Sequence, residues 1–145
     1  MFYRVWKMID EPNTFIIPGE LYSSKNSRVP LIYKDGQGKT IRKVVKSHAA
    51  SAQAKRLQGL FESNPDFVAS FRNEAEGRAL PLLLQIKIYR RARRRFDYNN
   101  ICQNLFDCMV KAGLLADDCA DQLLPIYLPY EVDENAPRVE LKILS

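Results

Sequence analysis

The chain has 145 residues, the length of one compact domain, and its 46% hydrophobic and 27% charged residues are typical of a globular protein with a core. No stretch approaches the ~18 consecutive apolar residues that a membrane helix needs. The N-terminus lacks the charge and apolar pattern of a secretory signal, so we expect a cytoplasmic protein. The net charge of +5 permits a polyanionic partner without proving one.

The N-terminal part of the chain predicts two strands and a loop. Residues 2–8 and 14–17 are rich in the β-branched and aromatic residues that strands favour. Pro18 and Gly19 end the second strand because both residue types favour turns. The polar segment 20–28 then predicts an irregular loop.

The next part predicts a hairpin followed by a helix. Residues 29–33 and 40–45 flank a glycine-containing turn, which indicates paired antiparallel strands. Ser47 is placed to cap a helix that runs to about Glu62, with apolar residues at helical spacing. Residues 66–76 are ambiguous and fit a short helix.

The C-terminal part adds strands around a second helix. Residues 80–89, 123–128 and 138–144 predict strands, and residues 99–112 predict an amphipathic helix. Gly113 is placed to end that helix in a left-handed turn. The fold class is therefore α/β, a single domain in which a small mixed β-sheet packs with two main helices.

Three cysteines, Cys102, Cys108 and Cys119, cannot all pair within one chain, and their spacing fits no common zinc motif. Reduced thiols in a cytoplasmic protein are the simplest interpretation. A Cys–His catalytic pair would need His48, the single histidine, and a lone histidine near a helix start is more often structural or exposed.

A dense run of cationic residues lies in one short segment. Residues 87–95 read KIYRRARRR, with six cationic residues among nine. Arg90, Arg91, Arg93, Arg94 and Arg95 are candidates to neutralise nucleic-acid phosphates, and Lys25 and Arg28 in the upstream loop are weaker candidates. The alternative is a solubilising surface that binds any anion.

The segment that follows carries a recognisable order of residues. Residues 93–118 read RRRFDYNNICQNLFDCMVKAGLLADD. This resembles the core signature of the RusA family of Holliday-junction resolvases, which runs basic residues, D-x-D-N, a lysine three positions on, F-D, K-A-G and D-D. The matching positions are Arg93, Arg94, Arg95, Asp97, Asn100, Phe106, Asp107, Lys111, Ala112, Gly113, Asp117 and Asp118. A looser match is IPGELYSSKNSR, at residues 17–28.

The resemblance implies a RusA-like homodimeric α/β endonuclease that resolves four-way DNA junctions in recombination and repair with Mg²⁺ or Mn²⁺, encoded by a phage, a prophage or a host chromosome. The family's essential carboxylates correspond to Asp97 and Asp118, with Asp117 adjacent. Two positions depart from the pattern, because Asn99 replaces the second aspartate of D-x-D and Gln103 replaces the lysine. One negative charge and one candidate catalytic cation are therefore missing.

Phosphodiester hydrolysis by divalent cations needs carboxylate ligands that converge. Asp97 precedes a helix of about 20 Å and Asp118 follows it, so in one protomer the chain must fold back, or a second subunit must supply the partner. Asn99 can offer a neutral carbonyl oxygen, and Asp121 is a candidate replacement ligand. Asp107, about 15 Å along the helix from Asp97, is expected to make a structural salt bridge or hydrogen bond.

Each candidate also has a structural interpretation. Asp97 is a good helix cap, and Asp117 and Asp118 resemble an ordinary acidic turn. Phe96 either stacks on bases at a junction or packs in a core or dimer interface. The same two interpretations apply to Tyr98, and packing is the favoured one.

Three functions follow in order of preference. The first is a metal-dependent, structure-selective endodeoxyribonuclease, and the second is a catalytically weakened relative that binds branched DNA without cutting it. Asn99 and Gln103 are the features that favour the second. A general RNA-binding protein ranks last, because the chain has no aromatic RNA-binding signature.

Overall fold

The computed structural model describes residues 8–11, 13–22, 28–46 and 48–144. Its elements are β1 (Ile9–Glu11), β2 (Thr14–Pro18), β3 (Arg28–Lys34), β4 (Thr40–Lys46), α1 (His48–Ser63), α2 (Pro65–Ala75), β5 (Leu82–Arg90), α3 (Tyr98–Lys111), β6 (Leu123–Tyr127), β7 (Glu131–Val132) and β8 (Arg138–Leu144). The strand predicted at residues 2–8 lies outside the described residues except for Met8, and the predicted cap Ser47 lies outside them too.

The main sheet is mixed, as the sequence predicts. Its strands follow the order β1-β2-β8-β5-β6, and β7 pairs with the end of β5. Strand β5 is antiparallel to β8 and parallel to both β6 and β7. The parallel β5–β6 pair is possible because α3 and its flanking loops carry the chain back across the sheet between the two strands.

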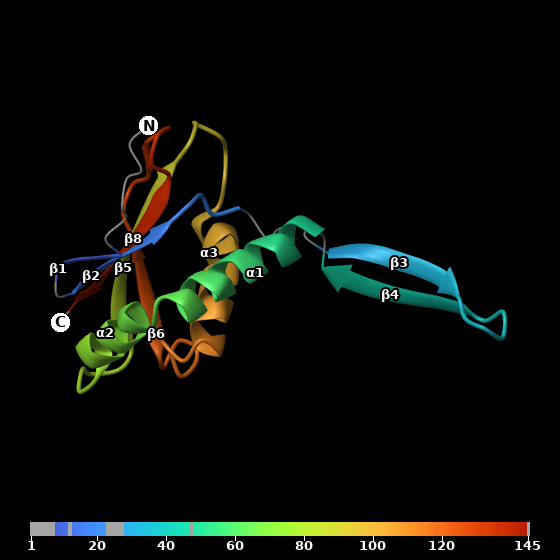
Figure 1. Cartoon of the computed structure of the whole chain (residues 1–145), viewed down its shortest axis with the longest axis horizontal. Helices are drawn as coiled ribbons and strands as arrows, with labels where there is room; N and C mark the ends of the chain where they lie inside the picture. Colours follow the sequence, from blue (N-terminus) through green and yellow to red (C-terminus); the bar gives the residue numbers. More distant parts are fainter. Residues whose placement is uncertain (1–7, 12, 23–27, 47, 145) are drawn as a thin grey trace.

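One hydrophobic core joins the sheet to the helices, whose arrangement is drawn in Figure 1. Alternate residues of β5 and β8 are buried, including Leu84, Ile86 and Leu141. They pack in the same cluster as Leu57 of α1 and Leu105 of α3. This alternation fits a sheet with one face covered by helices. The α/β prediction is confirmed.

Helix α2 resolves the segment that the sequence left ambiguous. Pro65 begins the helix, where its missing N–H removes no helical hydrogen bond. Phe67 and Phe71, four residues apart, lie on one face and are buried against Phe15 of β2, with ring centroids 5.5 and 5.1 Å away. These three aromatic rings therefore hold the short helix against β2.

The predicted hairpin is confirmed and stands apart from the main sheet. Strands β3 and β4 pair antiparallel along their whole length, from Arg28 opposite Lys46 to Lys34 opposite Thr40. Figure 1 shows the pair extending away from the rest of the chain. In the described part of the chain, every helix is too short or too polar to cross a bilayer.

Candidate nucleic-acid interface

The arginine-rich segment connects β5 to the start of α3. Arg91, Arg93, Arg94 and Arg95 are exposed there. The segment leaves the sheet at the end of its central strand and enters a helix whose N-terminus carries a partial positive charge. The predicted cationic surface is thus formed by these four side chains.

Arg90 is a correction to the predicted DNA-binding set. Its side chain is buried, with 7% of the residue exposed, and its guanidinium lies over the Phe96 ring at 4.6 Å. Nη1 donates a hydrogen bond to the carbonyl oxygen of Arg94 at 3.1 Å, and Nε lies 3.5 Å from the carboxylate of Glu20. Arg90 therefore shapes the arginine segment from beneath and is not available to a phosphate.

The loop at residues 18–22 forms the platform under this segment. Arg56 of α1 donates hydrogen bonds to the carbonyl oxygens of Pro18 and Glu20, at 2.9 and 3.1 Å. Gly19 has φ +97°, and a Cβ there would lie 2.5 Å from the Arg56 guanidinium. Burial lowers the pKa of Arg56. A glycine is needed because a side chain would be strained and would displace the arginine.

A second contact fixes the end of the same loop. The Gln53 amide accepts a hydrogen bond from the backbone N–H of Tyr22 and donates one to its carbonyl oxygen at 3.0 Å. Lys25 lies outside the described residues. Arg28 begins β3, and its side chain is likewise outside the description.

Aromatic side chains pack behind the arginines. Phe96 contacts Tyr98 and Tyr130 edge to face, with centroids 5.1 and 4.9 Å apart, and Tyr98 stacks on Tyr127. The backbone N–H of Tyr130 donates a hydrogen bond to the Tyr98 hydroxyl at 3.0 Å. Phe96 and Tyr98 are half-buried and pack within this cluster, and base stacking by Phe96 stays a prediction.

The cluster nevertheless leaves an open depression on the surface. It measures about 370 Å³ and is lined by Arg93, Arg94, Arg95, Phe96, Tyr98 and Tyr130. Arg93 lies 6.0 Å from the Tyr130 ring. Guanidinium groups beside aromatic edges suit a phosphate with an adjoining sugar or base.

Asp97 occupies the N-cap position of α3. Its backbone is extended, with φ −108° and ψ 130°, and its carbonyl oxygen accepts the N–H of Ile101 at 3.0 Å. The side chain makes no capping hydrogen bond and instead accepts the Asn100 amide at 3.3 Å. The cap interpretation therefore holds for the backbone, while the carboxylate stays exposed.

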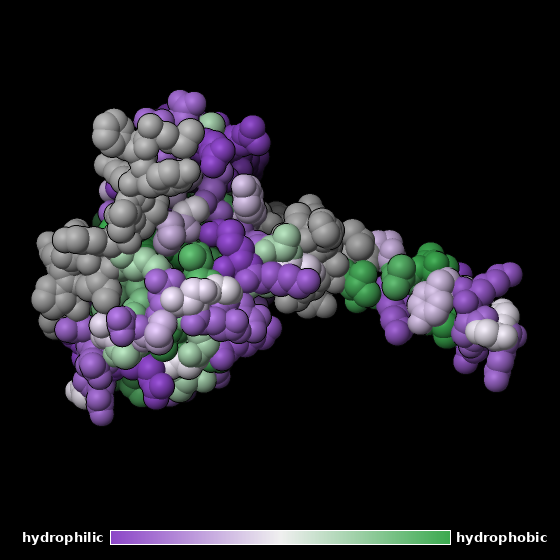
Figure 2. Space-filling view, viewed as in Figure 1, coloured by the Kyte–Doolittle hydropathy of each residue, from purple (hydrophilic) through white to green (hydrophobic). Residues whose placement is uncertain are grey.

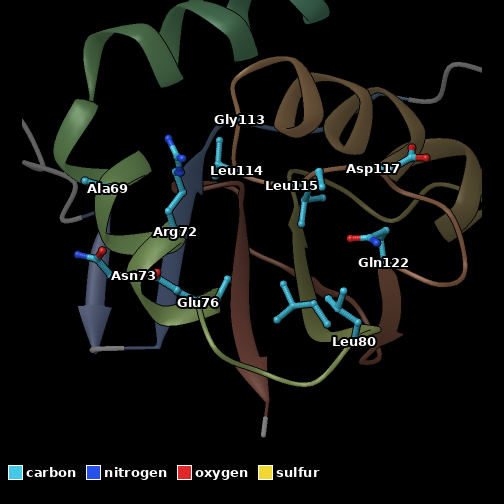
Figure 3. A pocket seen from close by; sticks show the side chains of 13 residues that line it. Ala69, Arg72, Asn73, Glu76, Leu80, Gly113, Leu114, Leu115, Asp117 and Gln122 are labelled. Atoms are coloured by element: carbon cyan, nitrogen blue, oxygen red, sulfur yellow. The ribbon is translucent and has the colours of Figure 1, made fainter.

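Asp117 and Asp118 lie toward the other end of α3. Gly113, with φ +84°, ends the helix as predicted, and Leu114 then bonds back to Met109. Figure 3 shows Asp117 beside α3, at the edge of a pocket of about 590 Å³ that the post-helix loop shares with α2. The chain folds back along the helix, as a single-protomer site requires, but only in part.

Asp107 is the carboxylate that Asp118 meets on this return. Asp118 is exposed, but nearby protein atoms still displace part of its hydration, and this together with the negative charge of Asp107 raises the pKa of its carboxyl. The Asp118 N–H also donates to the Asp117 carboxylate at 2.8 Å. Asp107 belongs to the acidic group, a role that the sequence analysis did not give it, although its position on the polar face of the helix allows it.

The predicted metal ligands do not converge in one chain. Asp107 is ten residues from Asp97, about 15 Å along the helix axis, so Asp118 stops well short of it. Asn99 is exposed in the first turn of α3, and Asp121 is exposed in the turn before β6. Among the described residues, no group of three or more acidic, histidine or cysteine side chains could hold a metal ion. These residues alone do not fit a Mg²⁺ site.

The three cysteines are free in the structure. Cys102 and Cys108 are buried in the core, while Cys119 is exposed. Burial raises the pKa of the Cys102 thiol to about 12, although a hydrogen bond with Tyr127 opposes the change. A thiol that stays protonated in a closed core is a poor nucleophile.

The chain matches no protein-family model and no curated protein sequence. The RusA resemblance therefore remains a prediction from the residues quoted above.

Proposed function

We propose that this protein binds branched DNA as a RusA-like protein, and that the arginine segment before α3 is its main contact. The observation that carries the proposal is the set of four exposed arginines held over the buried Arg90–Glu20 pair and beside the aromatic depression. Arginine forks suit phosphate oxygens. A segment fixed from below loses little conformational entropy on binding.

The acidic side chains explain why binding ranks ahead of cleavage. Asp97 lies at the N-terminal end of α3, and Asp118 lies toward its other end. The chain also has Asn99 and Gln103 where the resemblance implies a carboxylate and a cation. Phosphate contacts through arginine need none of these groups. The second of the sequence-based hypotheses, junction binding without cutting, is thus the better supported.

The deciding experiment measures binding of a synthetic four-way DNA junction against salt. The triple variant Arg93→Gln, Arg94→Gln, Arg95→Gln should bind ten- to a hundredfold more weakly near 0.1 M salt. Its plot of log Kd against log salt should lose about 2–3 from the slope, because each lost phosphate contact removes ~0.9.

The matched control removes three exposed cations from elsewhere in the molecule, as Lys55→Gln, Arg72→Gln and Lys111→Gln. It should bind the junction like the unmodified protein. Equal losses in both triples would mean general charge attraction and no defined interface. A linear duplex with the same arm sequence tests branch preference, and equal affinity for the two DNAs would remove that part of the proposal.

Metal-dependent cleavage is the second candidate, favoured by the negative charge of Asp107, which helps to raise the pKa of Asp118, and by the hydrogen bond from the Asp118 N–H to the Asp117 carboxylate. A homodimer, which the resemblance implies, can bring further carboxylates to this group. The test incubates end-labelled junctions with Mg²⁺, Mn²⁺ or EDTA. Symmetrical cuts that are lost in Asp118→Asn and Asp121→Asn but kept in Asp66→Asn would establish the nuclease, whereas tight binding without cuts in either metal would exclude it.

A further inference from the structure

The β3–β4 hairpin, called the ribbon below, is an exposed feature that extends from the rest of the chain. Its turn is built from its own residues: the Asp35 carboxylate accepts the backbone N–H groups of Gln37 and Lys39, both at 2.9 Å, and the Asp35 N–H donates to the Lys39 carbonyl oxygen. These bonds make the ribbon a regular two-stranded unit with a closed tip.

The ribbon carries the whole formal charge of the protein. Residues 28–46 contain six lysines and arginines and a single carboxylate, Asp35. The other 126 residues hold sixteen basic and sixteen acidic residues, so their formal charge is zero. The Asp35 carboxylate is engaged in the turn. A +5 arm on a neutral body is an electrostatic footprint for a polyanion.

Apolar side chains lie exposed among these charges. Ile32 and Val44 are 62% and 65% exposed, and Leu31 and Tyr33 are also exposed. Because cross-strand partners share a face, Ile32 lies beside Arg42. Figure 2 shows this mixture of hydrophobic and hydrophilic residues along the arm. An isolated two-stranded hairpin is only marginally stable in water, so the ribbon gains from a partner that contacts it.

We propose that the ribbon is a second DNA-binding element, which lies along a duplex arm with its cations on the flanking phosphates. A two-stranded ribbon fits the ~12 Å width of the major groove, and seven residues per strand extend about 23 Å. Exposed apolar side chains suit contacts with thymine methyl groups. The inference rests on the proposed function, because it assigns more of the same DNA to this protein.

The ribbon follows the loop that supports the arginine segment after a short stretch of chain. Tyr22 is fixed against Gln53, next to the loop that supports Arg90. From Tyr22 to Arg28 is six residues, which reach at most about 20 Å. The base of the ribbon is therefore within reach of the same DNA branch that the arginines would contact.

A second copy of the chain is a poorer occupant for the ribbon. Two ribbons that paired with each other would each bring a formal charge of +5 into contact, and like charges opposed at an interface are costly. A duplex arm instead supplies one phosphate charge per ~1.7 Å of axis. Charge complementarity thus selects DNA.

The test removes three exposed ribbon cations, as Lys34→Gln, Lys39→Gln and Arg42→Gln. Junction affinity near 0.1 M salt should fall at least tenfold, and the salt slope should drop by about 2–3. The triple Lys55→Gln, Arg72→Gln, Lys111→Gln has the same two lysines and one arginine and should change neither. Circular dichroism and thermal melting of both triples check that folding is unchanged.

The outcomes separate this inference from the proposed function. Loss of binding in the arginine triple with full binding in the ribbon triple overturns the ribbon assignment alone. A protein that binds no DNA fails both. Light scattering tests whether a second copy of the chain binds the ribbon instead. If the protein is a dimer that dissociates in the double variant Ile32→Ser, Val44→Ser while DNA binding is unchanged, the ribbon binds a second copy and the inference is overturned.

Discussion

The two ends of α3 differ in how their charges are held. At the N-terminal end, cations sit on a scaffold in which the buried Arg90 is paired with Glu20 and covered by Phe96. At the C-terminal end, Asp118 lies on the surface near Asp107, another group of the same sign. The N-terminal end holds a pair of opposite charges, whereas at the C-terminal end desolvation and the charge of Asp107 raise the pKa of Asp118.

The two ends of α3 suit different functions: the N-terminal end suits binding of a polyanion, and the C-terminal end suits binding of a cation. A cationic surface that binds a long polyanion needs side chains held in place, but it tolerates small deviations in their positions. The scaffold of Arg90, Glu20 and Phe96 holds the arginine segment in this way. A carboxylate held close to another carboxylate stores unfavourable energy, which a cation relieves. The same helix thus separates a binding surface from an acidic group that still lacks a complete ligand set in one chain.

The largest expected effect comes from breaking the scaffold. Glu20→Gln keeps the shape of the side chain but leaves Arg90 buried without a counter-charge; the two side chains are 13% and 9% exposed. Removing one partner of a buried ion pair costs about 3 kcal/mol of unfolding free energy. Urea denaturation measures this loss of unfolding free energy.

The control for that change is Glu74→Gln on α2. It breaks the more exposed ion pair with Arg78, which spans 3.4 Å, and should cost less than about 1 kcal/mol. If both substitutions cost the same, the Arg90 pair is no scaffold, and the contrast between the two ends of α3 loses its basis.

A smaller effect should follow from Tyr98→Phe. The ring still packs, but the backbone N–H of Tyr130 loses its acceptor, which costs about 1 kcal/mol or somewhat more. Tyr33→Phe on the exposed ribbon should leave stability unchanged. A silent Tyr98→Phe would mean that water replaces the hydroxyl and that the aromatic cluster is held by packing alone.

Local patterns predicted most of the fold. A largely apolar run indicated β5, helical spacing indicated α3, and Gly113 indicated its end. The two-residue β7 gave no such signal, because it exists only through pairing with the end of β5. Helix α2 was left open because its two buried phenylalanines make a short pattern.

The candidate site was less predictable for two physical reasons. Arg90 was taken as a surface arginine because it belongs to a basic run, yet it falls in phase with the buried residues Leu82 to Ile88 along β5. That alternation was the signal that would have removed it from the DNA-binding set. The separation of Asp97 from Asp118 depends on how far the chain folds back after α3, which no local pattern encodes.

The smallest effect is expected at the acidic end, with the opposite sign. Because the folded state raises the pKa of Asp118 above its unfolded value, the folded protein binds more protons in that range, and stability falls as pH rises through it. Asp118→Asn removes the charge, so its melting temperature should exceed that of the unmodified protein at pH 7, and the difference should vanish near pH 3.

Asp133→Asn provides the counterpart, because a hydrogen bond from Arg138 lowers the pKa of Asp133. That carboxylate stabilises the fold above its unfolded pKa, so the substitution should lower the melting temperature at pH 7, and the loss should shrink as pH falls through the folded pKa. If Asp118→Asn instead destabilises the protein at pH 7, its carboxylate is satisfied by its surroundings. The acidic end then has no stored repulsion for a cation to relieve, and the second candidate function loses the observation that favours it.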